Sequence, residues 1–475
     1  MRTDDLVIRG KIVLSVSKFA ELRLCAMTLC LLMISTNVMP AQELSFEYSF
    51  TFSQPRRAMN AEKNYSSLSG ALGKAKYLDK LVIRNKDLSE LGAAIERFKN
   101  LEVLDISETR IAELPSELAS LPKLKCVILS RNNFSQFPHV LLDVKNLEIL
   151  DLRENSIRYL PKNINKLNRL KVLVLSGNQI TEVPRSIEKM SELREIYLDD
   201  NKLKAFPEHI CKLSGVHTLS VSGNNLNSLP SSVALMKSLA YFDLSSNKLH
   251  SLPQNIGSLT GLKVLDVQNN HLINLPASIG KLDKLTYLNI KKNGISNLPS
   301  TFSDMQKLRT LIYSSNGLTA VPIEVIHCMR LENLDLSFNR LKNLDNEFYR
   351  LRSLENLSLR NNEFVEFPNE VTYCKSLKVL DLVKNKIKNI SNEIARMQEL
   401  VKLKLDNNFI DELTSAIGRL SNLTYLSLNY NKLRTVPNHF RFLRNLKVLS
   451  LRKNFIQSDE MQRIHRMLPD VILKF

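Results

Sequence analysis

The chain has 475 residues, a formal net charge of +18 and 44% hydrophobic residues, which is ordinary for a folded protein. A compact chain of this length is expected to split into two or three domains, unless it is built from repeats. The charge suggests nucleic acid, acidic membranes or acidic proteins as partners. Because no dense Lys/Arg block or nucleic-acid reading module accompanies it, we do not expect nucleic-acid binding.

Residues 1–41 are predicted to be a signal peptide or leader. Five basic residues precede an 11-residue apolar run, Leu24–Ile34, and Met39-Pro40-Ala41 follows, so cleavage after Ala41 is expected. The apolar run is too short to cross a bilayer, and we expect no membrane span. Two alternatives stay open: a true start at Met27, or an unrelated leader.

Residues 42–77 are predicted to form an N-terminal cap. Apolar and polar residues alternate over 44–52, which indicates a half-buried strand, and Ser66–Tyr77 has helical spacing of its apolar residues. These elements would cover the open edge of whatever follows, as a repeat array needs for solubility.

Residues 78–456 consist of one unit repeated every 23 residues without insertion or deletion. In the unit Leu239–Gly261, apolar residues occupy the first, fourth, sixth, eleventh and fourteenth places, and asparagine occupies the ninth. Sixteen complete units fill Leu78–Asn445 and a seventeenth begins at Leu446. A period in this range is typical of a solenoid, and the alternation at places four and six predicts a short strand in each unit.

Two further places support a structural repeat. The ninth-place asparagine is unbroken from Asn132 to Asn454, and a side-chain amide can satisfy backbone groups where the chain turns away from the strand. Proline usually follows place fourteen and fixes the backbone there, whereas Asp345, Ser391 and Thr414 replace it in later units, which we expect to be looser.

The pattern ends after Asn454, and residues 457–475 are predicted to be a C-terminal cap that contains a helix with one apolar face. Cys126, Cys211, Cys328 and Cys374 are single residues in separate units, so we expect small buried hydrophobic side chains rather than disulfides.

The unit LxxLxLxxNxLxxLPxxIxxLxx, as in Leu262–Lys284, resembles that of leucine-rich repeat proteins, most closely the 23-residue class of Ras-suppressor and Scribble-type proteins. The resemblance covers about four-fifths of the chain. It implies an α/β solenoid: a right-handed horseshoe of about 17 repeats, with a parallel β-sheet on its concave face and a cap at each end. Known members mostly bind other proteins through that face. The leader and the lack of cysteine-rich caps are closest in character to bacterial secreted members of the family.

No motif in the sequence carries catalytic or metal chemistry. The eight histidines stand at unrelated places of the repeat, and HExxH, GxSxG, P-loop and GxGxxG motifs are absent from the sequence. We therefore predict a non-enzymatic protein with no cofactor and no metal.

Places three, five, seven and eight should face the concave solvent, where exposed aromatic and charged residues are the usual anchors of a binding site. They are acidic in early units and basic in later ones, with aromatic residues between. The candidate partner-binding residues are Tyr197, Asp199, Asp200, Tyr241, Tyr287, Lys291, Phe338, Arg360, Lys402, Lys404, Tyr425 and Tyr430.

This pattern predicts a protein partner of mixed charge, with its basic end near Asp199 and Asp200 and its acidic end near Lys402 and Lys404. Reversing both lysines to glutamate should then weaken binding and flatten its salt dependence. The chain is interpreted as a binding module that is secreted or held in the cell envelope. The alternatives are a cytoplasmic signalling scaffold of the Ras-suppressor type and a structural envelope protein.

Overall fold

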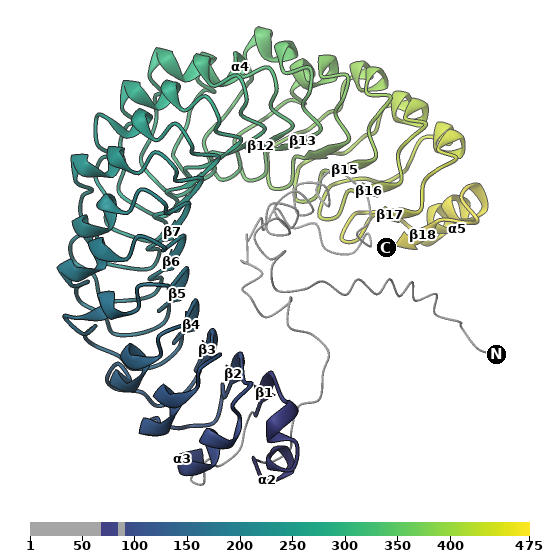
Figure 1. The fold of residues 1–475 in the computed structure, drawn as a ribbon. Coiled ribbons are helices and arrows are strands. Elements are labelled where there is room, and N and C mark those ends of the chain that lie inside the picture. The colour runs from purple at the N-terminus through teal and green to yellow at the C-terminus, as the bar shows by residue number, and fades with distance from the viewer. Residues whose placement is uncertain (1–67, 84–90) are drawn as a thin grey trace. The chain divides into compact units, whose positions relative to one another are not determined.

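The computed structural model describes residues 68–83 and 91–475. The predicted leader and the predicted strand 44–52 lie outside these residues. The described chain forms one curved stack of repeats. Short strands form a sheet on the inner side of the stack, and short helical turns lie on its outer side (Figure 1). The predicted solenoid of repeats with a parallel sheet is therefore confirmed.

Each strand spans three residues, and in the repeats these are places three to five of the unit. The strands are β1 (Lys80–Val82), β2 (Val103–Asp105), β3 (Cys126–Ile128), β4 (Ile149–Asp151), β5 (Val172–Val174), β6 (Glu195–Tyr197), β7 (Thr218–Ser220), β8 (Tyr241–Asp243), β9 (Val264–Asp266), β10 (Tyr287–Asn289), β11 (Thr310–Ile312), β12 (Asn333–Asp335), β13 (Asn356–Ser358), β14 (Val379–Asp381), β15 (Lys402–Lys404), β16 (Tyr425–Ser427), β17 (Val448–Ser450) and β18 (Ile472–Lys474).

The outer side is built mainly from single 3-10 turns, because a 23-residue unit leaves few residues for the return segment. Helical segments are α2 (Leu68–Leu72), η3 (Ala75–Tyr77), α3 (Leu91–Ala94), η4 (Ile95–Arg97), η5 (Ser116–Ser120), η6 (His139–Asp143), η7 (Ile164–Lys166), η8 (Arg185–Lys189), η9 (Glu208–Lys212), η10 (Ser231–Leu235), η11 (Ile256–Ser258), η12 (Ala277–Lys281), η13 (Ser300–Asp304), α4 (Ile323–Ile326), η14 (Asn346–Arg350), η15 (Asn369–Tyr373), η16 (Asn392–Arg396), η17 (Ser415–Arg419), η18 (Asn438–Phe442) and α5 (Ser458–Met467).

Every strand pairs in parallel with the next one along the chain, and residues at the same place of neighbouring units face each other. Tyr241 is opposite Val264, for example, and Val264 is opposite Tyr287. Places four and six point into the stack, where Leu265 and Val267 are fully buried. Identical places therefore form continuous rows along the solenoid, and this regularity positions the candidate site.

The ninth-place asparagines fix the turn after the strands from β3 to β17, as predicted. The Asn270 side chain donates from Nδ2 to the carbonyl oxygens of Leu244 and Val267, both at 3.0 Å, and its Oδ1 accepts from the amide of Leu249 at 3.0 Å. One side chain thus satisfies buried backbone groups in two adjacent units, and the arrangement recurs in the repeats up to Asn454.

The units without proline after place fourteen have a different contact in its place. Asp345, Ser391 and Thr414 each accept a hydrogen bond from the amide two residues ahead, at 2.7, 3.1 and 3.1 Å. These side chains cap the 3-10 turns that follow them, which a proline side chain cannot do. The structure therefore gives no sign of the looser packing expected there.

The C-terminal end differs from the repeats. Helix α5 packs Ile464 into the core, and β18 extends the sheet beyond the last repeat by pairing with β17. The carboxylate of Glu460 accepts from the Val436 amide at 2.9 Å and pairs with Arg463. The four cysteines singled out in the repeats are buried and free, as expected.

Candidate binding surface

The inner face of the sheet carries most of the residues singled out in the sequence. Side chains at places three and five project from it in rows, because neighbouring strands are in register and lie roughly 4.8 Å apart. Because the face is concave, side chains of adjacent units lie closer together along each row and shield one another from solvent. The side chains on this face are consequently more crowded than a count of residues suggests, and more of them contact other side chains of the same face.

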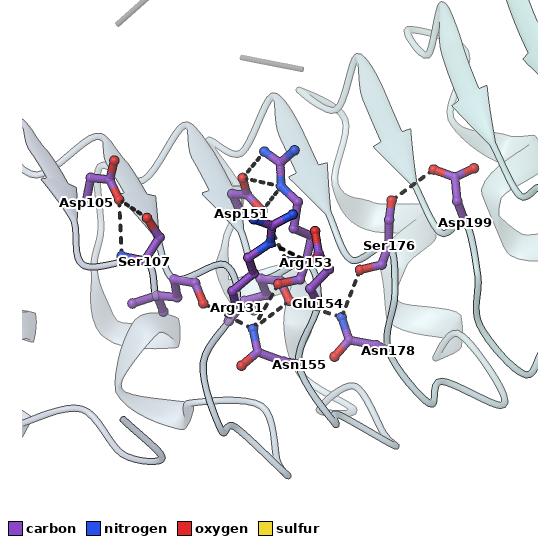
Figure 2. A network of polar contacts seen from close by, with 12 residues as sticks. Asp105, Ser107, Arg131, Asp151, Arg153, Glu154, Asn155, Ser176, Asn178 and Asp199 are labelled. Atoms are coloured by element: carbon purple, nitrogen blue, oxygen red, sulfur yellow. Dashed lines mark hydrogen bonds and ion pairs between the residues drawn. The ribbon is translucent and has the colours of Figure 1, made fainter. Parts of the chain in front are cut away.

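Its acidic end is partly neutralised by contacts within the chain (Figure 2). The Arg153 guanidinium donates from Nε to both carboxylate oxygens of Asp151, at 2.8 and 2.9 Å, and the pair is almost fully buried. At the turn nearby, Arg131 bridges Glu154 at 2.6 Å and Glu108 at 3.2 Å across three units.

Asp199 is held by hydroxyl groups rather than by a cation. Its carboxylate accepts from the Ser176 and Ser222 hydroxyls, each at 2.9 Å, and also from that of Ser220. Asp200 is exposed, and partial desolvation together with the charge of Asp199 raises the pKa of its carboxyl. Of the two predicted contacts for a basic partner, Asp200 is therefore the more available.

The middle of the face differs from the prediction. Tyr241 and Tyr287 are 7% and 5% exposed, so they are buried constituents of the inner rows rather than exposed anchors. Beside them, burial raises the pKa of Asp266, and the charge of Asp243 on the adjacent strand raises it further. Burial raises the pKa of Asp243 as well. This stretch consequently carries less negative charge near neutral pH than its composition implies.

The basic side chains of the later repeats also contact other residues of the chain. Lys402 is 7% exposed, with its ammonium 5.3 Å from the centre of the Tyr425 ring. Lys404 lies 3.6 Å from the buried Asp381 carboxylate. Reversing Lys402 and Lys404 would therefore disturb the sheet as well as any binding. Lys291 and Arg360, both half-buried on the same face, are better probes of its positive charge.

Place eight was wrongly grouped with the strand positions. In every repeat from Glu108 to Lys453 its backbone has a positive φ, for example 51° at Asp200, 54° at Phe338 and 55° at Tyr430. The strand has ended by then, and these residues lie at the rim where the chain turns onto the flank. Gly177 and Gly223 at the same place were the sequence signal for this left-handed conformation.

Three of the predicted residues are therefore exposed at the rim, namely Asp200, Phe338 and Tyr430. Six are half-buried on the inner face: Tyr197, Asp199, Lys291, Arg360, Lys404 and Tyr425. Tyr241, Tyr287 and Lys402 are buried. Sequence reasoning missed Ser176, Ser220 and Ser222 as partners of Asp199, because residues 21 or 23 positions away in the chain are placed beside it only once the register is known.

Two further observations on the structure concern metal binding and membrane crossing. Across residues 68–83 and 91–475, no group of three or more His, Cys, Asp or Glu side chains is placed to hold a metal ion. Within the same ranges, no helix combines the length and the apolar character that a bilayer crossing needs.

Comparison with known proteins agrees with this architecture. A family model described as a leucine-rich repeat region matches residues 236–316, and one described as leucine rich repeat matches residues 145–203 and 398–456. No curated protein matches the chain.

Solved structures extend the likeness over most of the chain. The leucine-rich repeat protein LIC12759 of Leptospira interrogans is 32% identical, with a TM-score of 0.72 over 87% of this chain and 100% of that chain. The GASSHO1/SCHENGEN3 receptor kinase ectodomain of Arabidopsis thaliana, in complex with CASPARIAN STRIP INTEGRITY FACTOR 2, is 28% identical, with a TM-score of 0.62 over 82% of this chain and 49% of that chain.

A third structure is the Arabidopsis receptor kinase HAESA in complex with the peptide hormone IDA. It is 26% identical, with a TM-score of 0.57 over 79% of this chain and 70% of that chain. The repeat unit, the in-register parallel sheet and the match to the whole Leptospira protein agree, and the chain belongs to the leucine-rich repeat family.

Proposed function

We propose that the chain is an exported, non-enzymatic protein-binding module, and that the inner face of its solenoid is the surface that engages the partner. The observation that carries this proposal is the continuous inner sheet from β1 to β18, with polar, charged and aromatic side chains in regular rows. Its 18 strands, separated by 17 spacings of roughly 4.8 Å, form a line of about 80 Å, long enough for an extended segment or a protein edge.

Two solved structures support this choice, since the GASSHO1/SCHENGEN3 ectodomain is in complex with CASPARIAN STRIP INTEGRITY FACTOR 2 and HAESA is in complex with the peptide hormone IDA. A partner of this chain would meet Asp200 after β6, and Lys291 and Arg360 farther along the sheet, after β10 and β13. Complementary charge would fix the partner's direction along the sheet more than it would add to affinity. The basic N-terminal residues and the apolar run Leu24–Ile34 support export.

The proposal can be tested with a photo-cross-linking aromatic amino acid introduced at Tyr197 and Tyr425 on the inner face. Tyr373 and Phe442, in the outer turns η15 and η18 and 53% and 48% exposed, are matched aromatic controls. In the native host, the inner positions should give a discrete protein adduct and the outer positions should not. The adduct should be in the envelope or the medium, with a chain that begins near Gln42.

Each alternative gives a different result. Adducts in the cytosol on a chain that begins at Met1 or Met27 would favour an intracellular scaffold over an exported module. No discrete adduct from either inner position would favour a structural envelope protein. Adducts from the outer positions alone would place the binding surface elsewhere.

A further inference from the structure

One flank of the C-terminal repeats has a composition unlike the rest of the surface. After each strand the chain turns outward at place nine, and places eight, ten and twelve are on the flank that follows. In the six units that begin at Leu331, these places hold eight cations, two carboxylates and four aromatic rings. We call this the basic aromatic flank. Its cations are Arg340, Lys342, Lys384, Lys386, Lys388, Lys432, Arg434 and Lys453, and its rings are Phe338, Phe409, Tyr430 and Phe455.

The cations are exposed and almost without partners. Among residues 91–475, the only ion pair that these side chains make joins Lys386 to Glu363 at 3.8 Å. Lys432 instead lies over the Phe409 ring, 5.1 Å from its centre. An array of like charges this close together raises the energy of the free protein, and a negatively charged surface would lower it.

The aromatic rings are exposed to a degree that folding does not require. Phe338, Phe409, Tyr430 and Phe455 are between 45% and 57% exposed. Phe338 and Tyr430 occupy the left-handed place, with φ of 54° and 55°, where earlier repeats have Gly177 and Gly223. A bulky aromatic residue is disfavoured at positive φ. Its presence there in two repeats indicates that the ring serves something outside the fold.

Two neighbouring surfaces show that the arrangement is local. On the same flank of the early units, Arg131 at place eight is paired with Glu108 and Glu154, also at place eight. On the opposite flank of the C-terminal units, Lys378 pairs with Glu355 at 2.9 Å, and Arg309 pairs with Glu332. Unpaired positive charge together with exposed rings is thus concentrated on one flank of the units that contain β12 to β17.

We propose that the basic aromatic flank docks on the surface of a bilayer that contains anionic lipids. Three features favour a membrane over an acidic protein. The same places recur in every unit, so the side chains form regular rows that span roughly 24 Å over five strand spacings. The rows lie on a flank built from turns. Exposed rings beside unpaired lysines and arginines are the combination that holds peripheral proteins at the headgroup level.

In this arrangement the ammonium and guanidinium groups would contact lipid phosphates, and the rings of Phe409 and Phe455 would enter the boundary of the acyl chains. The inner face would remain free, because the flank and the sheet are different sides of the same repeats. This inference is independent of the proposed protein partner and adds a second surface to the molecule.

The test measures partition of the full chain onto vesicles of phosphatidylcholine with and without one-third phosphatidylglycerol. The flank variant is Lys342→Glu/Lys388→Glu/Arg434→Glu, in which all three residues are exposed at place twelve. The matched control is Lys263→Glu/Lys284→Glu/Lys307→Glu, which alters three exposed lysines near the start of their strands. Both triple variants have the same net charge. A third variant, Phe409→Ser/Phe455→Ser, keeps every charge.

Wild type should bind the anionic vesicles and not those of phosphatidylcholine alone. Because each cation near an anionic surface contributes about a fivefold factor, loss of three should weaken binding by about a hundredfold. The control triple should lose far less, and the serine variant should lose the part of binding that persists at high salt.

Three results would overturn the proposal. The wild-type protein could fail to bind anionic vesicles at low ionic strength. The control triple could lose as much as the flank triple, which would mean that only net charge matters. Alternatively, the flank variant could lose binding to an acidic polypeptide while wild type binds no vesicle, which would assign the flank to a protein partner. Circular dichroism of each variant confirms that the repeats remain folded.

Discussion

Replacing Asn270 with alanine is expected to lower the free energy of unfolding by about 3–5 kcal/mol. The substitution leaves the amide of Leu249 without its acceptor and removes one of the two donors to the carbonyl oxygens of Leu244 and Val267, which keep their bonds from Asn247 and Asn293. Leaving the buried amide unsatisfied costs about 1–3 kcal/mol, and each lost hydrogen bond removes about 0.5–1.5 kcal/mol. Asn270 itself is 6% exposed, so water has little access to replace the lost contacts.

The measurement is urea unfolding followed by circular dichroism, with Asn274→Ala as the control. Asn274 belongs to the same repeat but is exposed, and its replacement should change stability by less than about 0.5 kcal/mol. Because neighbouring repeats stabilise one another, hydrogen exchange should show the largest loss of protection in the units on either side of Asn270. Equal effects of the two substitutions would show that the asparagine row contributes no more than surface residues do.

Replacing Asp151 with alanine should destabilise the protein by about 3–5 kcal/mol, because it leaves the Arg153 guanidinium buried without a counter-charge. The two side chains are 2% and 4% exposed, and both carboxylate oxygens accept hydrogen bonds from Arg153. Removing both residues together should restore much of the loss, since the uncompensated charge is then gone.

Thermal unfolding of the two single variants and the double variant forms a double-mutant cycle that measures this coupling. Asp143→Ala is the matched control: Asp143 also pairs with a cation, Lys166 at 3.2 Å, but both side chains are more than half exposed. An exposed pair contributes at most about 1 kcal/mol. A double variant as unstable as the sum of the two single variants would argue against a coupled ion pair at Asp151 and Arg153.

The sequence was sufficient for the architecture because each structural requirement recurs at a fixed spacing. The row from Asn132 to Asn454 and the leucines at places four and six leave one way to stack the units, and the observed pairing follows it. The surface was less predictable. Whether Lys404 is free depends on Asp381 one strand away, and whether Asp199 is free depends on serines in two other units. Such contacts become apparent only when register brings distant residues together.

The exposed fraction of each side chain was the second property that the repeat pattern could not predict. Tyr241 and Tyr430 read alike in sequence, as aromatic residues on the strand side of the repeat. Tyr241 stands within a strand and is shielded by adjacent rows, whereas Tyr430 follows the strand, in a left-handed turn, and is 55% exposed. Alternation describes only the three residues of each strand and ends before place eight.

The central claim is that a protein partner binds the inner face of the sheet. The most direct measurement is the affinity of the cross-linked partner, once identified, for wild type, for Lys291→Glu/Arg360→Glu and for the matched flank variant Lys342→Glu/Arg434→Glu. Both variants have the same net charge. The inner-face variant should bind at least tenfold more weakly and with a flatter dependence on salt, while the flank variant should bind as wild type does. Equal affinity of wild type and the inner-face variant would contradict the account.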